Sequence, residues 1–258
     1  MQNSTNNSII WIDTVDSTND EAKRKIHSLS HLSVIAAYEQ TSGRGQRGNI
    51  WSSEAGKNLT FSIIIKYGKD GYYDLIPSNQ FIISKITSIA VLDLLSKYGI
   101  KAEIKWPNDI YVNDKKIAGI LIEHTLHGNS IAYSIIGIGI NVNQMQFLEE
   151  LNGKATSLAK ELSKEFDRDV IIDKVVESFY YYYEKFLATE DLSALKEIYN
   201  QMLVNQDKEV VIHEPGNEYH ARAIGINEQG ELIVETVDGR QQNIYAGEVS
   251  VRGVYGYV

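Results

Sequence analysis

A run of isoleucines interrupted by two glycines, Ile135-Ile136-Gly137-Ile138-Gly139-Ile140-Asn141, constrains the fold more than any other segment. The run ends a β-rich stretch over residues 131–140, and a second β candidate covers residues 116–124. His127-Gly128-Asn129 between them is typical of a hairpin turn. Because alternate residues of a strand face the same side, the two glycines predict the flat floor of a binding pocket.

The isoleucine run is not a dinucleotide-binding fingerprint. The third glycine of that pattern is replaced here, and no helix signal follows the strand. Asn141, at the end of the strand, is instead a candidate for contact with a base edge.

The remaining pattern predicts an α/β domain followed by a small β unit. A possible capping box of Thr18 and Glu21 opens a helix that we expect to run to about Ser28. Further strands are expected over residues 8–13, 34–39, 59–66 and 110–112. A long helix is expected to begin at Pro77, and further helices over residues 157–163, 173–187 and 192–203. From about Gln206 short alternating strands are separated by turn formers, which predicts a domain of residues 1–205 and a small β-barrel of residues 206–258.

Composition excludes several classes of protein. The formal net charge of −9 argues against a general nucleic-acid binder, which usually carries a basic stripe. The absence of cysteine excludes disulfides, zinc–thiolate sites and thiol nucleophiles. Residues 1–8 are polar, without the apolar core of a signal peptide, and no apolar run reaches the length of about 20 residues that crosses a bilayer. We therefore expect a cytoplasmic protein.

The hexamer Gly43-Arg44-Gly45-Gln46-Arg47-Gly48 alternates glycines with guanidinium groups. Backbone amides and fixed positive charge can both approach an anion closely in such a loop. A solvent-exposed hairpin tip would explain the hexamer equally well. Trp51 can supply a face for adenine, although a core residue at a strand edge is the alternative interpretation.

The segment Lys105-Trp106-Pro107-Asn108-Asp109 predicts a tight turn with a polar rim. Pro107 favours extended backbone at Trp106, but a structural turn gives no reason for the preceding lysine. Lys116, beside Ala118 and Gly119, offers a second cation; its alternative role is that of a solvated lysine on an edge strand. Cations and glycine-rich backbone are what the reaction of a carboxylate with a nucleoside triphosphate requires, so these segments predict an adenylate-forming ligase.

Two other features receive no chemical role. Tyr180–Tyr183 lie in a helical pattern that displays four consecutive tyrosines all round the helix. Core packing with a subunit contact is favoured over base stacking, given the acidic surroundings. The six histidines show no metal-ligand spacing.

These segments closely resemble, in order along nearly the whole chain, the motifs of the biotin protein ligases, enzymes that attach biotin to a carrier lysine. The matching segments are Ser17-Thr18-Asn19, Gln40 with Gly43-Arg44-Gly45, Lys105 to Asp109, Lys116 to Glu123, Gly137 to Asn141, and Gly247-Glu248-Val249-Ser250-Val251-Arg252. The resemblance implies an α+β fold in which helices flank the mixed sheet of a class II synthetase-like catalytic domain, with a small C-terminal SH3-like barrel.

The resemblance also implies roles for individual residues. Residues implied in biotin binding are Ser17, Thr18, Asn19, Gln40, Gly43, Arg44, Gly45, Gln46, Lys116, Gly119, Leu121, Gly137 and Gly139. Those implied at ATP or the adenylate are Arg44, Arg47, Trp51, Asn108, Asn141 and Arg252. Arg44, Lys105, Asp109 and Lys116 are implied in catalysis, with Asp109 as a candidate ligand of Mg²⁺. The implied partner is the biotin carboxyl carrier protein of a biotin-dependent carboxylase, and the implied assembly is a monomer or weak homodimer.

The chain departs from the family pattern in two respects. Gln46 and Asn49 stand where many relatives have arginines, which weakens the expected clamp on the intermediate. Some bacterial relatives also carry an N-terminal helix-turn-helix domain; because the motifs here begin at Ser17, we expect a monofunctional enzyme that binds no DNA. Two alternatives remain open, a lipoate–protein ligase and a non-catalytic module that senses biotinyl-adenylate.

Overall fold

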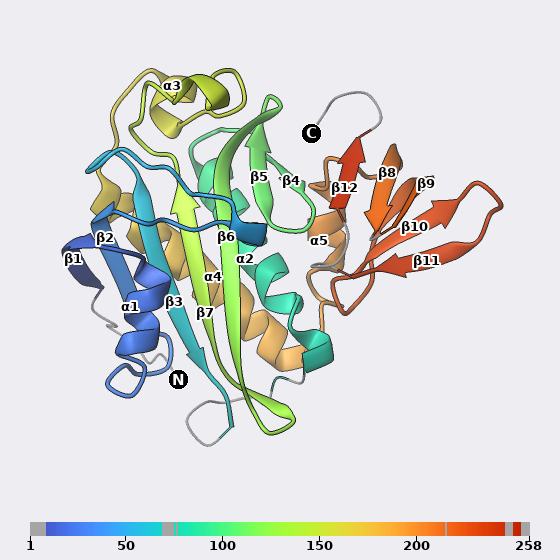
Figure 1. The fold of residues 1–258 in the computed structure, drawn as a ribbon, viewed down its shortest axis with the longest axis horizontal. Coiled ribbons are helices and arrows are strands. Elements are labelled where there is room, and N and C mark those ends of the chain that lie inside the picture. The colour runs from blue at the N-terminus through green and yellow to red at the C-terminus, as the bar shows by residue number, and fades with distance from the viewer. Residues whose placement is uncertain (1–8, 69–74, 76, 215, 246–249, 254–258) are drawn as a thin grey trace. The chain divides into compact units, whose positions relative to one another are not determined.

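The computed structural model describes residues 9–68, 75, 77–214, 216–245 and 250–253 (Figure 1). The chain divides into two compact units, Met1–Pro77 with Ile117–Val170, and Ser78–Lys116 with Ile171–Val258. The boundary falls within one strand, β6 (Lys115–His127). None of the described helices is long and apolar enough to cross a membrane.

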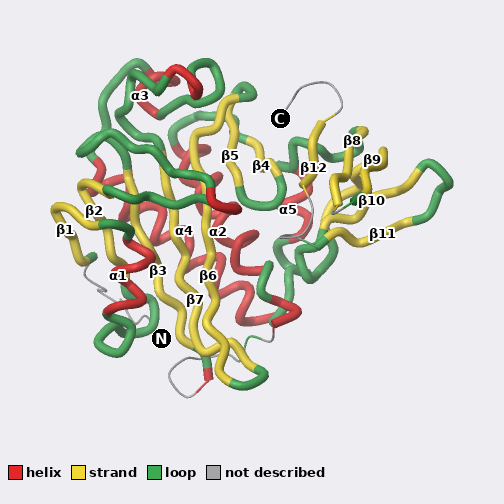
Figure 2. The backbone as a smooth tube through the Cα atoms, viewed as in Figure 1, coloured by secondary structure: helices red, strands yellow, loops and turns green. Residues whose placement is uncertain are grey.

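The first unit is built on a mixed sheet (Figure 2). Its strands are β1 (Ile10–Val15), β2 (Val34–Gln40), β3 (Leu59–Lys66), β7 (Ser130–Ile140) and β6, in the spatial order β1-β2-β3-β7-β6. β1 pairs with β2 in parallel, and the other pairs in this series are antiparallel. The predicted hairpin between β6 and β7 is confirmed: His127 pairs with Ser130, and Gly128 has a φ of 60°.

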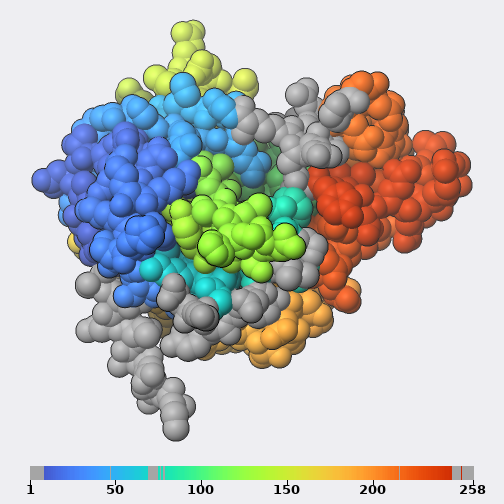
Figure 3. Space-filling view, turned by 60° about the horizontal axis from the view of Figure 1, so that its bottom comes forward, coloured from blue at the N-terminus to red at the C-terminus, as the bar shows by residue number. Residues whose placement is uncertain are grey.

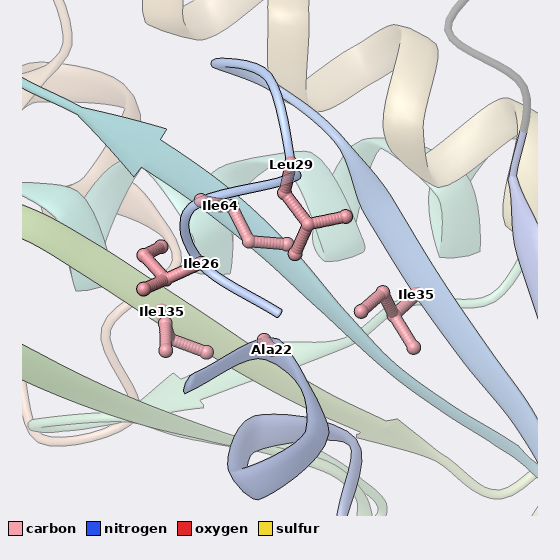
Figure 4. Packing of buried hydrophobic residues seen from close by; sticks show 6 residues of the cluster. All are labelled: Ala22, Ile26, Leu29, Ile35, Ile64 and Ile135. Atoms are coloured by element: carbon pink, nitrogen blue, oxygen red, sulfur yellow. The ribbon is translucent and has the colours of Figure 1, made fainter. Parts of the chain in front are cut away.

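Helix α1 (Thr18–Arg24) packs on β2, β3 and β7 (Figure 4). Its core residue Ala22 and the following Ile26 and Leu29 meet isoleucines of the sheet, Ile35, Ile64 and Ile135. Burying an aliphatic side chain of this size contributes about 1.5–3 kcal/mol, which fixes the helix on this face. In the space-filling view of Figure 3, the blue N-terminal segment lies beside the green segment of β6 and β7.

The predicted capping box at the start of α1 is wrong. Ser17 is the N-cap residue and makes no capping hydrogen bond through its side chain. Thr18 is the first residue of the helix, and its hydroxyl lies 2.8 Å from Ser62 Oγ on β3. The helix also ends at Arg24, four residues before the predicted Ser28.

The other helices follow the predicted order with shifted ends. The 3₁₀ turn η3 (Pro77–Asn79) precedes α2 (Ile82–Lys97), so the helix does not begin at Pro77. The later helices are α3 (Leu158–Leu162), α4 (Arg168–Thr189) and α5 (Lys196–Gln201), with a 3₁₀ turn η4 (Glu149–Leu151) before them. In the tyrosine run of α4, Tyr183 is 2% exposed and Tyr181 54% exposed. The predicted core packing is confirmed for Tyr183, and the subunit contact stays a prediction.

The second unit contains the hairpin of β4 (Glu103–Lys105) and β5 (Asp109–Val112), together with the C-terminal sheet. That sheet comprises β8 (Glu209–Glu214), β9 (Asn217–Ile226), β10 (Leu232–Thr236), β11 (Gln241–Ile244) and β12 (Ser250–Gly253), in the order β11-β10-β9-β8-β12. All of its described strand pairs are antiparallel. A domain boundary at residues 205 and 206 stays a prediction.

Candidate active site

Two rows of residues, all small except Leu121, cross one face of β3, β7 and β6. Directly paired residues share a face of the sheet, and the rows are Thr60-Gly139-Gly119 and Ser62-Gly137-Leu121. The two glycines of β7 therefore lie on one face, as their alternation predicts. The following row, with Ile64 and Ile135, belongs to the core beneath α1.

Two side chains lie close against these glycines. A Cβ atom at Gly137 would stand 2.5 Å from Oδ1 of Asn19, and one at Gly139 would stand 2.3 Å from Cε2 of Trp51. With Asn19 and Trp51 in these positions, no residue larger than glycine fits at position 137 or 139. The glycines thus allow an amide from α1 and an indole from the glycine loop to rest on the sheet.

The first turn of α1 gathers the residues implied in biotin binding. Ser17, Thr18 and Asn19 are buried, and the backbone N–H of Thr18 donates to Oε1 of Gln40 over 2.7 Å. Ser62 Oγ donates to Asn19 Oδ1 over 2.7 Å. The structure therefore brings these four predicted residues together at the start of α1 and the end of β2.

Glu123 on β6 is a member of this cluster, and no role was assigned to it from the sequence. Its carboxylate accepts hydrogen bonds from Asn19 Nδ2 at 2.8 Å, Lys23 Nζ at 2.7 Å and Arg44 at 3.2 Å. Burial raises the pKa of Glu123, but the hydrogen bonds from Lys23 and Asn19 and the charges of Lys23 and Arg44 outweigh it, so the pKa lies below its ordinary value. Strand alternation could have identified Glu123 from the sequence, since it lies on the same face of the strand as Gly119 and Leu121.

The glycine loop forms a small closed hairpin. The backbone N–H of Trp51 donates to the Gly43 carbonyl at 3.0 Å, and the backbone N–H of Gly45 donates to the Asn49 carbonyl at 2.7 Å. Between them Gln46 opens a 3₁₀ turn, η1 (Gln46–Gly48); the side chain of Arg47 lies outside the described residues. The hairpin tip foreseen as an alternative is thus present, and it does not exclude binding.

The Arg44 guanidinium projects from this hairpin to two carboxylates. It contacts Asp20 Oδ1 at 2.7 Å and Glu123 Oε2 at 3.2 Å, while its side chain remains 41% exposed. An exposed guanidinium held in this way can still present donors to an anion.

The second unit holds the lysine-tryptophan turn. Lys105 ends β4 and pairs with Asp109 at the start of β5, so Trp106, Pro107 and Asn108 form the connection. The Trp106–Pro107 peptide bond is cis, and Asn108 is buried. The tight turn that Pro107 and Asn108 predict is therefore confirmed.

Lys116 is anchored to this turn. Its Nζ lies 2.8 Å from Asp109 Oδ1, and the two side chains are 32% and 24% exposed. Burial, and then the negative charge of Asp109, raise the pKa of Tyr111 above its ordinary value. The structure thus joins Lys116 to Asp109, two predicted catalytic residues seven positions apart, and leaves both accessible to solvent.

Asn141 and Arg252 are two of the residues implied at the nucleotide. Asn141 is buried at the end of β7, and its Nδ2 donates to the Thr156 carbonyl at 3.0 Å. Its backbone carbonyl accepts from Leu158 at the start of α3, so the residue has a clear structural role and its contact with a base stays a prediction. The backbone of Arg252 pairs with Val211 in the C-terminal sheet, but its side chain lies outside the described residues.

The donor set for a metal is sparse. Within the part of the chain that the structure describes, no group of three or more histidine, cysteine, aspartate or glutamate side chains is placed so that it could hold a metal ion. A single partly exposed carboxylate such as Asp109 fits Mg²⁺, which commonly keeps several waters and is bound through one or two carboxylates plus substrate phosphates.

Comparison with known proteins gives consistent matches along the chain. Residues 11–141 match the biotin/lipoate A/B protein ligase family, and residues 207–252 match the biotin protein ligase C-terminal domain. The chain is 30% identical over 239 residues to the bifunctional ligase/repressor BirA of Salmonella typhimurium, covering 92% of this chain and 72% of that protein. It is 29% identical to the biotin–[acetyl-CoA-carboxylase] ligase of Paracoccus denitrificans, covering 92% and 98% of the two chains.

Solved structures give the same result. The chain is similar to a biotin protein ligase from Aquifex aeolicus in complex with biotin and ATP, with a TM-score of 0.79 and 28% identity, covering 95% of this chain and 99% of that one. This similarity confirms the predicted α+β fold class, with a mixed sheet and a C-terminal β unit.

Proposed function

The chain belongs to the biotin/lipoate A/B protein ligase family, and we propose that it is a biotin protein ligase that uses ATP to activate biotin and transfers it to a lysine of a carrier protein. One observation carries the proposal: similarity over 95% of the chain to a ligase described with biotin and ATP. The match of residues 207–252 to the biotin protein ligase C-terminal domain favours biotin over lipoate as substrate.

The proposed chemistry has two steps. A carboxylate oxygen of biotin attacks the α-phosphorus of ATP, a new P–O bond forms, and the bond to pyrophosphate breaks. The carrier lysine then attacks the carbonyl carbon of the mixed anhydride, its amine loses a proton, and AMP leaves as the amide forms. Both steps develop or shift negative charge, which fixed cations and donors stabilise.

For the biotin head group we propose Ser17, Thr18, Asn19 and Gln40. Their support is the burial of Ser17, Thr18 and Asn19, the hydrogen bond from the Thr18 backbone N–H to Gln40, and the one from Ser62 Oγ to Asn19, because such bonds hold polar groups in one orientation. The ring system and tail are assigned to the face of β6 and β7 that carries Gly119, Leu121, Gly137 and Gly139, beside the Asn19 and Trp51 side chains that lie against the two β7 glycines. Gly43, Gly45 and Gln46 are assigned to the same ligand through the loop backbone.

For the carboxylate and phosphates we propose Arg44 and Lys116, with Lys105 and Asp109 organising the triphosphate. The ion pairs of Arg44 and Lys116 with carboxylates support these roles, because a held cation needs little reorganisation when an anion arrives. Trp51, Asn108, Asn141, Arg47 and Arg252 are assigned to ATP or the adenylate. Bound Mg²⁺ would neutralise phosphate charge, and Asp109 is the residue that would hold it.

The proposed partner is a biotin carboxyl carrier protein of a biotin-dependent carboxylase, the class of substrate named for the Paracoccus denitrificans relative. We also propose a cytoplasmic location, a monomeric or weakly dimeric state, and no binding of specific DNA. The net charge of −9 supports the last of these, since it disfavours approach to phosphate backbones.

The test is mass spectrometry of the purified protein after incubation with biotin, Mg²⁺ and ATP, with lipoate in a parallel sample. We expect biotinyl-adenylate and pyrophosphate from biotin and no lipoyl-adenylate. Added carrier protein should then gain one biotin. Adenylation of lipoate alone would favour the lipoate–protein ligase, and binding of biotin and ATP without pyrophosphate release would favour the sensing module.

A further inference from the structure

Lys85 is a fully buried lysine in the middle of α2, at 0% exposure. Its Nζ donates to the carbonyl of Pro107 over 3.0 Å. The ammonium also lies 5.3 Å from the ring centre of Trp106 and 5.6 Å from that of Tyr199, within the range of cation–π attraction. Two of these three contacts belong to the lysine-tryptophan turn.

The same lysine touches the C-terminal sheet. The turn between β9 and β10 places Gly230, at a φ of 82°, against its side chain, and a Cβ there would stand 3.1 Å from Lys85 Cγ. The indole Nε1 of Trp106 donates to the Gly230 carbonyl over 3.4 Å. Three segments, α2, the 106–108 turn and the β9–β10 turn, therefore meet at this side chain.

A lysine is an expensive choice for such a position. Burial of an ammonium costs several kcal/mol unless it is well paired, and well-packed apolar side chains of similar volume are commonly neutral or stabilising in its place. What a methionine could not supply is a donor for the Pro107 carbonyl and a charge for the two rings. Lys85 therefore adds a hydrogen bond that holds the 106–108 turn in place.

We propose that Lys85 is a positioning residue for the nucleotide, because its Nζ donates to the Pro107 carbonyl and thereby fixes Asn108 and Asp109. This inference rests on the proposed function, which assigns those two residues to ATP. Asp109 in turn contacts Lys116 at 2.8 Å, so a shift of the turn would also move that cation. Lys85 itself touches neither substrate nor reacting atoms in this scheme.

A role in nucleotide positioning predicts a selective defect. Lys85→Met keeps the volume and removes the donor, and Lys85→Gln restores a neutral donor on a shorter side chain. We expect Lys85→Met to fold, to bind biotin within about twofold of the wild type, and to show a KM for ATP raised about tenfold, equivalent to about 1.4 kcal/mol. Lys85→Gln should fall between the two. Lys101→Met, the same substitution at an exposed position, is the control.

The experiment combines ATP-dependent pyrophosphate exchange with a biotin-binding titration and circular dichroism. An unchanged KM for ATP in folded Lys85→Met would overturn the proposal, as would an equal loss of biotin and ATP affinity, because a general packing role would produce it. Failure of both variants to fold would assign Lys85 to folding instead. If the wild-type protein releases no pyrophosphate with biotin, the proposed function fails, and this result is distinct from either outcome at Lys85.

Discussion

Gly139 lies directly against the indole of Trp51: a Cβ on the glycine would stand 2.3 Å from Cε2 and 2.7 Å from Nε1 of that ring. The two residues come from β7 and from the end of the glycine loop, 88 positions apart in a chain of 258. The loop is thus seated on the sheet through one aromatic contact. The position of the residue assigned to adenine therefore depends on a glycine assigned to biotin.

Gly139→Ala should displace the indole, since overpacking of this kind commonly costs about 1–3 kcal/mol. We expect ATP affinity to fall by about tenfold or more and biotin affinity to fall less. Calorimetric titration with each ligand measures the two effects. A variant that bound ATP as the wild type does would show that Trp51 is not a nucleotide contact.

Gly137→Ala, two residues earlier, supplies the matched comparison. Its Cβ would meet the carboxamide of Asn19 at 2.5 Å, so the residue assigned to the biotin head group would move. The expected pattern is the reverse, with a larger loss of biotin affinity than of ATP affinity. Identical profiles for the two alanine variants would contradict the separate roles of Asn19 and Trp51.

Lys116→Ala should slow adenylation by about 10²–10³, the usual effect of removing one well-placed electrostatic partner. Biotin should still bind, more weakly. Single-turnover pyrophosphate release gives the rate, and Lys115→Ala on the same strand is the control, expected near the wild-type rate. A near-normal rate in Lys116→Ala would remove this lysine from the mechanism.

Glu123→Gln should weaken biotin binding, because a neutral amide holds Asn19, Lys23 and Arg44 less firmly than a carboxylate does. The variant should also be less stable than the wild type at pH 7. Since the folded pKa of Glu123 is lowered from an ordinary value of 4.5, the stability from its charge is complete above that value and is lost as pH falls through the folded pKa. Urea unfolding at pH 7 and pH 3.5 should show the gap between the two proteins narrowing; a constant gap would refute this linkage.

Lys85 predicts a stability that also rises with pH, but over a higher pH range. Burial lowers its pKa from 10.5 to about 7, so between these values the unfolded chain holds a proton that the folded chain lacks. The destabilisation caused by burying the charged lysine is complete below pH 7. As pH rises from there toward 10.5, the free energy of unfolding increases by up to about 1.4 kcal/mol per pH unit. In urea unfolding at pH 6.5, 8 and 9.5, the free energy of unfolding of the wild type should increase with pH relative to that of Lys85→Met. Parallel curves for the two proteins would show that this lysine does not titrate as described.

Local patterns were sufficient for several features. The alternation of Gly137 and Gly139, the turn at His127-Gly128-Asn129 and the constraint of Pro107 act within a few residues, so the hairpin of β6 and β7 and the tight turn could be predicted. The polar motifs indicated the class of chemistry for the same reason, because the types of residue and their spacing are themselves the signal. Helix ends were less predictable, as α1 shows by ending at Arg24.

Tertiary structure alone decided which side chains meet. Thr18 was expected to cap a helix, but Ser62 of β3 lies 2.8 Å from its hydroxyl, a contact across 44 residues that no local pattern contains. In the sequence, Glu123 cannot be distinguished from an ordinary strand glutamate. Only the folded structure brings Asn19 of α1 and Arg44 of the glycine loop to its carboxylate. Lys85 reads as one polar residue in an apolar helix until Pro107 approaches it. Sequence determines the structural propensity of each segment through local sterics and alternation. The partners of a polar side chain depend instead on how distant segments pack, and in this protein those partners determine the protonation and the role of the side chain.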